Sequence, residues 1–372
     1  MRSGRPIRSC RIDERDPHAR GTAIGTAWRE RIGAGWQAYE RLFAAAGAGP
    51  SLQREVAERS HERTRSWAPA LADEITGIAA GAGLEPWHVA ALNARTEVLA
   101  ATGAETAGEC STFVVVPPGG GPPRTVQTWD WYEDLRDNVL LLTVGTGRGG
   151  AVHLFTEFGI VGKVGVNEAG LGLHFNILHH AADGGAPGVP VHVVARRILD
   201  EAATVEEATE LARSATVSAS TVLTVVGWDG GRASARGLEL SPAGVGVLEP
   251  DAAGVLAHTN HFLDPVLARG ERPTDFDATS RGRLEALGRR VGALRAAGDA
   301  PTRARALVDH ESGICAHALA DQPPGQQSAT LATIALDVGT SSVHVHRGGP
   351  CVAAGAGDWT SAGGDLGHFG AA

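Results

Sequence analysis

The feature that most constrains this fold is a change of hydrophobic pattern at Cys110. Before it, apolar residues recur at three- and four-residue spacings in residues 21–47, 71–82 and 85–101, which predicts amphipathic helices. After it, β-branched runs separated by Gly and Pro clusters predict strands. The boundary reads AGECSTFVVV, residues 107–116. A cysteine at such a boundary can be a core residue, a metal ligand, or a new N-terminus made by cutting the chain.

The order of elements after the boundary predicts an α+β fold. A block of strands is followed by a helix pair that starts at Pro190 and Thr204, and then by strands, helices and two last strands. Sheets covered by helices on their outer faces fit this order. The chain has 372 residues, which is enough for one large domain or two smaller ones with ample core.

Composition excludes several classes of protein. A net charge of −9 argues against a nucleic-acid or anionic-membrane surface. There is no apolar run of about 18 residues, and the first residues, MRSGRPIRSCRIDERD, lack the apolar stretch of a signal peptide. Four cysteines are too few for a disulfide framework. We therefore expect a cytoplasmic protein with reduced thiols, and the absence of phosphate-loop and dinucleotide motifs predicts no cofactor.

Several separate motifs stand in one order along the chain. They are ALNARTE, GECSTFVVVP, VQTWDWYEDL, VGKVGVNEAGLGLHFNILHH and AHTNHFLDP. Together they resemble the penicillin acyltransferase-like (acyl-CoA:6-aminopenicillanic acid acyltransferase) family of autoproteolytic N-terminal nucleophile cysteine hydrolases. The resemblance runs from Arg20 to Cys351.

The resemblance implies a fold and a maturation step. The fold is a four-layer αββα sandwich with a helical N-terminal segment. The chain is made as an inactive precursor, a zymogen that cuts its own backbone between Glu109 and Cys110. Residues 1–109 then form a mainly helical α chain and residues 110–372 a β chain that carries the nucleophile, and the two chains stay associated.

Cys110 suits the chemistry that the resemblance implies. Only the thiolate is a competent nucleophile, and a free cysteine has a pKa of about 8.5. An α-amino group on the same residue has a pKa of about 7.7–8.0, so it can take the thiol proton near neutral pH. The strand that follows is a rigid mount. The competing interpretation is a buried, inert cysteine.

Asp130 is the second candidate catalytic residue. It lies between Trp129 and Trp131, where an unpaired carboxylate is costly to bury. We therefore expect a cationic partner, and the ammonium freed at Cys110 is a candidate. The alternative is an aspartate that caps a turn. The related amidases have an arginine near this aspartate, where this chain has Gln127.

Four further polar residues complete the candidate site. The amide N–H of Asn260 can stabilise a tetrahedral oxyanion, and Asn176 matches a second polar position of the related amidases. Both can instead cap strand ends. Ser280 and Arg283 reproduce an S-x-x-R spacing of the family, where the arginine can support the catalytic cluster or bind a carboxylate; alternatively, Arg283 belongs to the solvated face of a helix.

No metal site is predicted. His258 and His261, like His344 and His346, lack a further ligand at zinc spacing. We expect Arg95 and Glu97 to form a structural ion pair or to be surface charges. The family often has S-I-C-R near the end of the helical block, but residues 312–317 read SGICAH, which indicates a different specificity.

The sequence thus predicts a self-cleaving cysteine amidohydrolase or acyltransferase. Its substrate is a small acyl amide or acyl-CoA thioester, its intermediate is an acyl-cysteine, and coenzyme A enters only as an acyl donor. The alternative is an uncleaved, catalytically silent binding protein on the same scaffold.

Overall fold

We describe the single unbroken chain in a computed structural model. The described residues are 6–104, 109–147, 149–272, 279–319, 322, 325–355 and 357–364. None of the helices in this part of the chain is long and apolar enough to span a bilayer.

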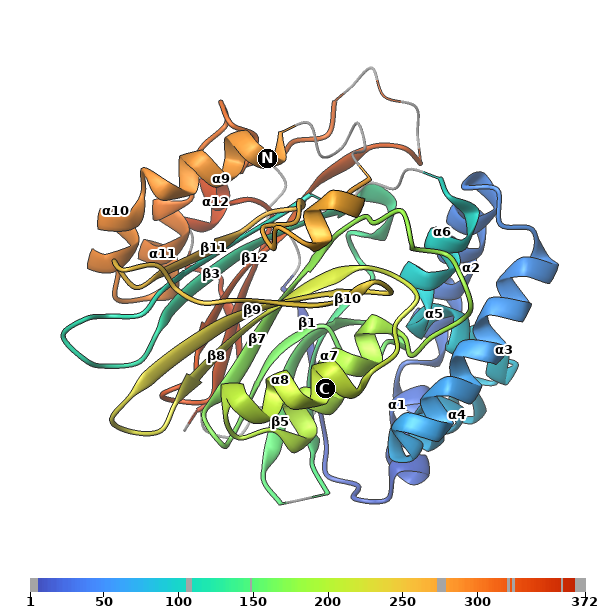
Figure 1. The fold of residues 1–372 in the computed structure, drawn as a ribbon. Coiled ribbons are helices and arrows are strands. Elements are labelled where there is room, and N and C mark those ends of the chain that lie inside the picture. The colour runs from blue at the N-terminus through green and yellow to red at the C-terminus, as the bar shows by residue number, and fades with distance from the viewer. Residues whose placement is uncertain are drawn as a thin grey trace.

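Two β-sheets form the centre of the molecule (Figure 1). The larger sheet has the order β1 (Arg8–Ile12), β4 (Val139–Gly145), β5 (Ala151–Glu157), β6 (Val164–Asn167), β7 (Leu171–Ile177), β8 (Thr221–Trp228), β9 (Ala233–Ser241) and β10 (Gly244–Leu248). The smaller has the order β11 (Val255–His258), β2 (Cys110–Val115), β3 (Arg124–Tyr132), β12 (Ser328–Asp337), β13 (Ser342–Arg347) and β14 (Thr360–Gly363). Only the β1–β4 pair is parallel among the described strands.

The two sheets pack face to face, and helices cover their outer faces. β2 lies against β7, and β12 lies against β6. On the larger sheet lie α7 (Val191–Glu201) and α8 (Val205–Ser214); on the smaller lie α9 (Ser280–Gly288), α10 (Val291–Ala296) and α11 (Ala300–Ala306). Strands such as β4, VLLLTVG, are apolar on both faces because both faces are covered. The expected α+β, four-layer αββα architecture is confirmed.

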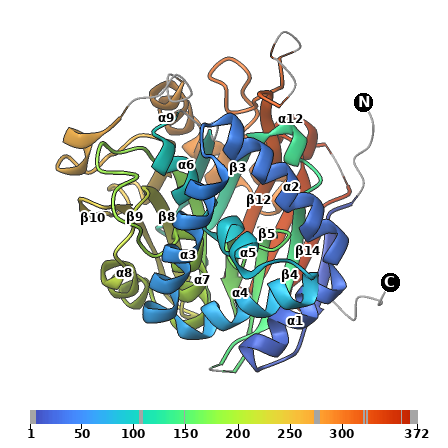
Figure 2. The ribbon, with the colours of Figure 1, turned by 90° about the vertical axis from the view of Figure 1, so that its right-hand side faces the viewer.

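The N-terminal helices form a block at one side of the sandwich, seen face-on in Figure 2, and share its hydrophobic core. They are α1 (Pro17–Ala27), α2 (Arg29–Ala45), α3 (Pro50–Trp67), α4 (Pro69–Ala82), α5 (Pro86–Asn93) and α6 (Arg95–Thr102). Glycines bring α1 and α4 together: a Cβ on Gly21 would lie 2.1 Å from the carbonyl oxygen of Glu74. No larger residue fits this close approach.

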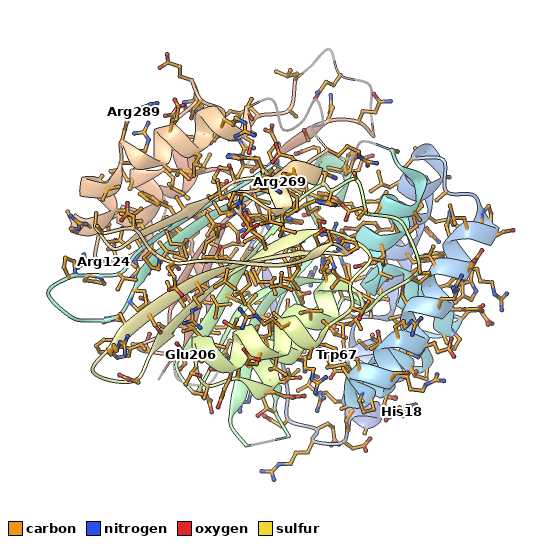
Figure 3. The ribbon with its side chains drawn as sticks, viewed as in Figure 1. His18, Trp67, Arg124, Glu206, Arg269 and Arg289 are labelled. Atoms are coloured by element: carbon orange, nitrogen blue, oxygen red, sulfur yellow. The ribbon has the colours of Figure 1, made fainter. Side chains whose placement is uncertain are left out.

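Trp67, at the end of α3, contacts the helices α7 and α8 that cover the larger sheet (Figure 3). Its indole N–H donates to the Ser214 hydroxyl at 3.0 Å. The guanidinium of Arg197 lies 4.3 Å from the centre of its ring, a cation–π contact. The two regions are therefore joined by side chains of both.

Several predicted boundaries were wrong. Residues 21–47 form two helices with a break at Trp28, and 85–101 break at Ala94. The predicted helix 280–297 likewise ends at Gly288 and restarts at Val291. Helix α3 and the edge strands β1 and β14 were not predicted, nor were α12 (Pro350–Ala353), η1 (Glu133–Leu135) and η2 (Leu267–Gly270). Apolar spacing continues through such breaks, so periodicity alone does not reveal them.

Candidate active site

Cys110 is the first residue of β2, a central strand between β11 and β3, and only 2% of its surface is exposed. Polar side chains form hydrogen bonds with both its backbone N–H and its backbone carbonyl. Its N–H donates to Asn260 Oδ1 at 2.8 Å. Its carbonyl accepts from Arg283 Nη1 at 2.8 Å and from Asn176 Nδ2 at 3.2 Å. Three of the residues selected from the sequence thus converge on the predicted nucleophile.

The peptide before Cys110 is also fixed. The carbonyl of Glu109 accepts a hydrogen bond from the backbone N–H of Asp130 at 3.1 Å. The Glu109 carboxylate accepts from the Thr279 hydroxyl at 2.7 Å and lies 3.8 Å from the guanidinium of Arg283. The backbone N–H of Asp130 therefore polarises the carbonyl that a maturation reaction would attack.

The side chain of Asp130 is buried without an ion-pair partner among the described residues. It is 2% exposed, and neither carboxylate oxygen has a hydrogen bond of normal geometry within the described residues. Burial raises the pKa of Asp130 well above its usual value, while the Thr330 hydroxyl and the charge of Arg283 oppose the rise. A cation added beside this carboxylate would stabilise its ionised form.

The thiol of Cys110 is protonated in the unbroken chain. Burial and the negative charge of Asp130 raise the pKa of Cys110 to about 12. The N–H of Asp130 and the charges of Lys163 and Arg283 act in the opposite direction. The unbroken chain therefore needs a proton acceptor near this thiol for it to act as a nucleophile.

Asn260, Ser280 and Arg283 form one unit. Arg283 Nη2 donates to Asn260 Oδ1 at 3.0 Å, and Asn260 Nδ2 donates to the Ile177 carbonyl at 2.9 Å. The Ser280 hydroxyl accepts from the backbone N–H of Asn260 at 2.8 Å. In this state Asn260 accepts hydrogen bonds beside Cys110, and Ser280 positions its backbone. Arg283 is fully buried, so its alternative placement on a solvated helix face is wrong.

Asn176 connects the two sheets. From β7 in the larger sheet, its Nδ2 reaches the carbonyl of Cys110 in the smaller sheet, and its Oδ1 accepts from Thr112 Oγ1 at 2.6 Å. Gln127 donates to the same Oδ1 at 3.1 Å and to the Phe175 carbonyl at 2.7 Å. Gln127 therefore lies between the sheets and connects β3 to β7.

Comparison with known proteins assigns the chain to a family. The family model described as "Acyl-coenzyme A:6-aminopenicillanic acid acyl-transferase" matches residues 119–350. The chain belongs to this family. It is 32% identical over 213 residues to the Emericella nidulans acyl-coenzyme A:6-aminopenicillanic-acid-acyltransferase 40 kDa form, a match that covers 57% of this chain and 57% of the relative. The family expected from the sequence is confirmed.

Solved structures that match the chain have lower sequence identities. Penicillin V acylase from Agrobacterium tumefaciens aligns with 64% of this chain and 83% of its own, at 15% identity and a TM-score of 0.39. A mutant of conjugated bile acid hydrolase from Clostridium perfringens aligns with 64% of this chain and 89% of its own, at 12% identity and a TM-score of 0.40.

A buried charged cluster next to Cys110 was missed from the sequence. Lys163 Nζ lies 2.7 Å from Glu157 Oε2 and 3.6 Å from the centre of the Trp129 ring. Burial lowers the pKa of Lys163 to about 7. Arg95 lies 3.3 Å from the same Glu157 carboxylate. The signal was available, because Lys163 is the only lysine in a chain that otherwise uses arginine.

The expected pairing of Arg95 with Glu97 was therefore wrong. Both side chains are buried, but Arg95 pairs with Glu157, and Glu97 accepts the backbone N–H of Val191 at 2.8 Å. Residues two positions apart in a helix lie on different faces, so each of these finds a partner elsewhere.

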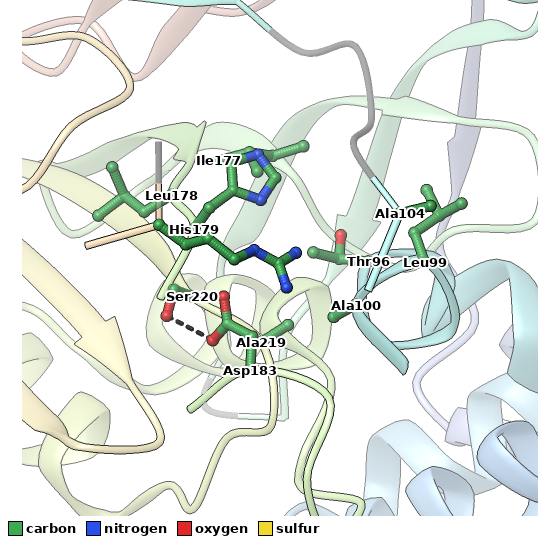
Figure 4. A pocket seen from close by; sticks show the side chains of 11 residues that line it. Thr96, Leu99, Ala100, Ala104, Ile177, Leu178, His179, Asp183, Ala219 and Ser220 are labelled. Atoms are coloured by element: carbon green, nitrogen blue, oxygen red, sulfur yellow. Dashed lines mark hydrogen bonds between the residues drawn. The ribbon is translucent and has the colours of Figure 1, made fainter. Parts of the chain in front are cut away.

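A pocket lies between α6 and the ends of β7 and β8 (Figure 4). Leu99, Ala100 and Ile177 give it an apolar wall, and Ile177 is the residue whose carbonyl binds Asn260. Its polar lining includes Arg272 and Asp183, and the Asp183 carboxylate accepts from Ser220 at 2.6 Å. The pocket therefore offers an apolar surface and both signs of charge.

Among the described residues, one group of three side chains has ligand atoms close enough together to bind a metal ion: His310, Cys315 and Cys351. It does not include Cys110, Asp130 or Asn260, so nothing in this geometry assigns a metal to the candidate active site.

Proposed function

We propose that this chain is a self-cleaving cysteine amidohydrolase or acyltransferase with Cys110 as its nucleophile. The observation that carries the proposal is the convergence of Asn260, Arg283 and Asn176 on the two backbone groups of Cys110. Membership of the acyl-transferase family supports acyl transfer as the reaction type. The match covers only 57% of the relative's length. The activity of that relative is therefore attributed to this chain only as part of the proposal.

The proposed maturation step takes place at the Glu109–Cys110 peptide. Cys110 Sγ attacks the carbonyl carbon of Glu109, and the thiol proton passes to the departing amide nitrogen of Cys110. The C–N bond breaks and a thioester forms. Water then hydrolyses the thioester, which gives the Glu109 carboxylate, a free thiol and a new amine. The N–H of Asp130, 3.1 Å from the Glu109 oxygen, stabilises the negative charge that develops on it.

The new amine completes the site in this proposal. As an ammonium it supplies the cation that the buried Asp130 carboxylate lacks. As a neutral amine it takes the thiol proton, so nucleophile and base belong to one residue. Asn260 acts as an oxyanion donor once its Nδ2 turns from the Ile177 carbonyl toward a bound substrate.

Turnover then follows a two-step path. Cys110 Sγ attacks the acyl carbon of an amide or thioester, and the protonated amine gives its proton to the leaving amine or thiol. Water or a second amine resolves the acyl-cysteine. We place the acyl group in the pocket lined by Leu99, Ala100 and Ile177.

Intact mass measurement of the purified protein tests the nucleophile. The wild type is expected to give two fragments separated at the Glu109–Cys110 bond, and Cys110→Ala a single chain of 372 residues. A wild type that stays in one piece and does not react with a thiol reagent at Cys110 would favour the silent binding protein instead.

Two further measurements refine the reaction. Products formed with and without an added amine acceptor separate hydrolysis from acyl transfer. Ala100→Trp fills the proposed acyl pocket, so kcat/KM for acyl substrates is expected to fall while self-cleavage continues. Unchanged kinetics for this variant would move the acyl group elsewhere.

A further inference from the structure

Two histidines and two cysteines meet outside the candidate active site, near one end of the smaller sheet. His310, Cys315 and His317 lie in the loop between α11 and β12, and Cys351 lies in α12. The ligand atoms of His310, Cys315 and Cys351 all lie within 4.8 Å of one another. His317 Nε2 lies 3.6 Å from Cys351 Sγ, and its ring stacks on that of His310 with centroids 5.2 Å apart.

The separation of one pair of these atoms equals that of two ligands in a tetrahedral zinc site. Zn–S bonds of about 2.3 Å and Zn–N bonds of about 2.0–2.1 Å imply a sulfur–nitrogen separation of about 3.6 Å between two ligands of one ion. Cys351 Sγ and His317 Nε2 have this separation. Two thiolates and two imidazoles bind zinc in preference to cations that favour oxygen ligands.

We propose that His310, Cys315, His317 and Cys351 bind a structural zinc ion, a site that the sequence-based expectation of no metal did not include. His317, whose side chain is exposed and contacts Cys351 Sγ, would turn toward the other three ligands to complete the set. Each cysteine loses its proton to solvent as its sulfur binds the metal. Cys315 is buried, whereas His310 and His317 are exposed, so an ion can enter from solvent.

The proposed ion has a clear structural task. The loop that carries three of its ligands is paired with β12: the N–H of Ala316 donates to Thr330 Oγ1 at 3.0 Å, and the N–H of Thr330 donates to the Ala316 carbonyl at 3.0 Å. Thr330 is the cross-strand partner of Asp130. By joining this loop to α12, the metal would fix the position of Thr330, the residue of β12 that lies opposite Asp130.

A disulfide between Cys315 and Cys351 is the alternative use of these thiols. A disulfide would not explain why two imidazoles lie close to these sulfur atoms. Both cysteines are free in the structure. The histidines therefore favour a metal over a disulfide.

The test measures metal in the whole protein. Protein purified under reducing conditions and supplied with zinc is expected to retain one ion per chain after dialysis, and cobalt in its place is expected to give thiolate charge-transfer and tetrahedral ligand-field absorption. His317→Ala, an exposed position that should fold normally, is expected to weaken zinc binding at least about 100-fold, beyond the loss of a supporting group. Cys315→Ser and Cys351→Ser are expected to lose the cobalt spectrum.

Cys10→Ser is the matched control, because Cys10 is a free, partly buried thiol on β1 in the other sheet. It is expected to retain zinc and the cobalt spectrum. The proposal is overturned if the wild type takes up no zinc with its thiols reduced, if Cys10→Ser loses the metal as Cys351→Ser does, or if Cys315 and Cys351 are recovered as a disulfide from reduced material. Since the readouts are metal content and spectra, they do not depend on the proposed activity of Cys110.

Discussion

The buried charges around Glu74 and the buried charges around Asp130 are arranged differently. Glu74, on α4, accepts hydrogen bonds from Arg20 at 2.6 Å and from Arg196 at 3.1 Å. Arg196 also donates to Asp200 at 2.8 Å. Two carboxylates here face two guanidiniums. Around Cys110, by contrast, Arg283 binds a backbone carbonyl and an amide oxygen, and the Asp130 carboxylate has no ion pair among the described residues.

The difference separates a structural role from a functional one. A buried network that satisfies every charge specifies how three helices pack. An unpaired buried carboxylate costs stability and persists where a function uses it. We infer that the first cluster is complete as it stands, whereas the second awaits the ammonium that chain cleavage would create.

Removing Glu74 is expected to have the largest effect on folding. Glu74→Ala leaves Arg20 and Arg196 without their shared partner, which should lower the free energy of unfolding by about 3–5 kcal/mol. Glu55→Ala is the control, because its pair with Arg59 is exposed and should contribute less than about 1 kcal/mol. Chemical denaturation measures both; equal losses would mean that the α4 cluster is not structural.

Arg283→Lys is expected to slow self-cleavage about 10²–10³-fold, the usual cost of removing a preorganised donor. A single ammonium cannot reach both the Cys110 carbonyl and Asn260 Oδ1 as the guanidinium does. Arg281→Lys, on the exposed side of the same helix and paired with Glu271, should cleave at the normal rate. The rates are followed by electrophoresis after synthesis, with thermal melts to confirm folding. Normal cleavage in Arg283→Lys would show that its contacts only support the fold.

Asp130→Asn tests the unpaired carboxylate in a chain that cannot cleave, Cys110→Ala. Because burial raises the pKa of Asp130, the carboxyl favours folding at acid pH and disfavours it as pH rises through its folded-state pKa. The amide should therefore raise the free energy of unfolding by about 1–3 kcal/mol at pH 7, and by less at pH 4. Asp337→Asn removes a carboxylate that pairs with Arg303, and His344 and Arg303 lower its pKa despite burial, so this variant should destabilise the fold instead. A loss of stability in both variants at pH 7 would contradict the proposed difference between Asp130 and a paired carboxylate.

The pH dependence of maturation should show the smallest effect. Since the pKa of Cys110 is raised to about 12, the thiolate fraction rises about tenfold for each pH unit between 7 and 9. If thiolate attack limits self-cleavage, the rate in the slowed Arg283→Lys precursor should follow this slope. A flat profile would place the limiting step after the attack.

The sequence by itself determined the boundary at Cys110, the α+β order of elements and the family. The change from helical to strand periodicity depends on neighbouring residues, so it can be read along the chain. It also indicated Cys110, Asp130, Asn176, Asn260, Ser280 and Arg283, whose motifs are local. Their catalytic roles, and cleavage into residues 1–109 and 110–372, remain predictions.

Only the tertiary structure decided which partners these residues have. Arg283 and the carbonyl it binds are 173 residues apart in the chain, and Asn176 comes from the other sheet. The Lys163–Glu157–Arg95 cluster and the four side chains around Cys351 are assembled in the same way from distant segments. Such contacts arise when two sheets pack and bury polar groups that must find partners across the interface, and no periodic pattern in the sequence records which partners they find.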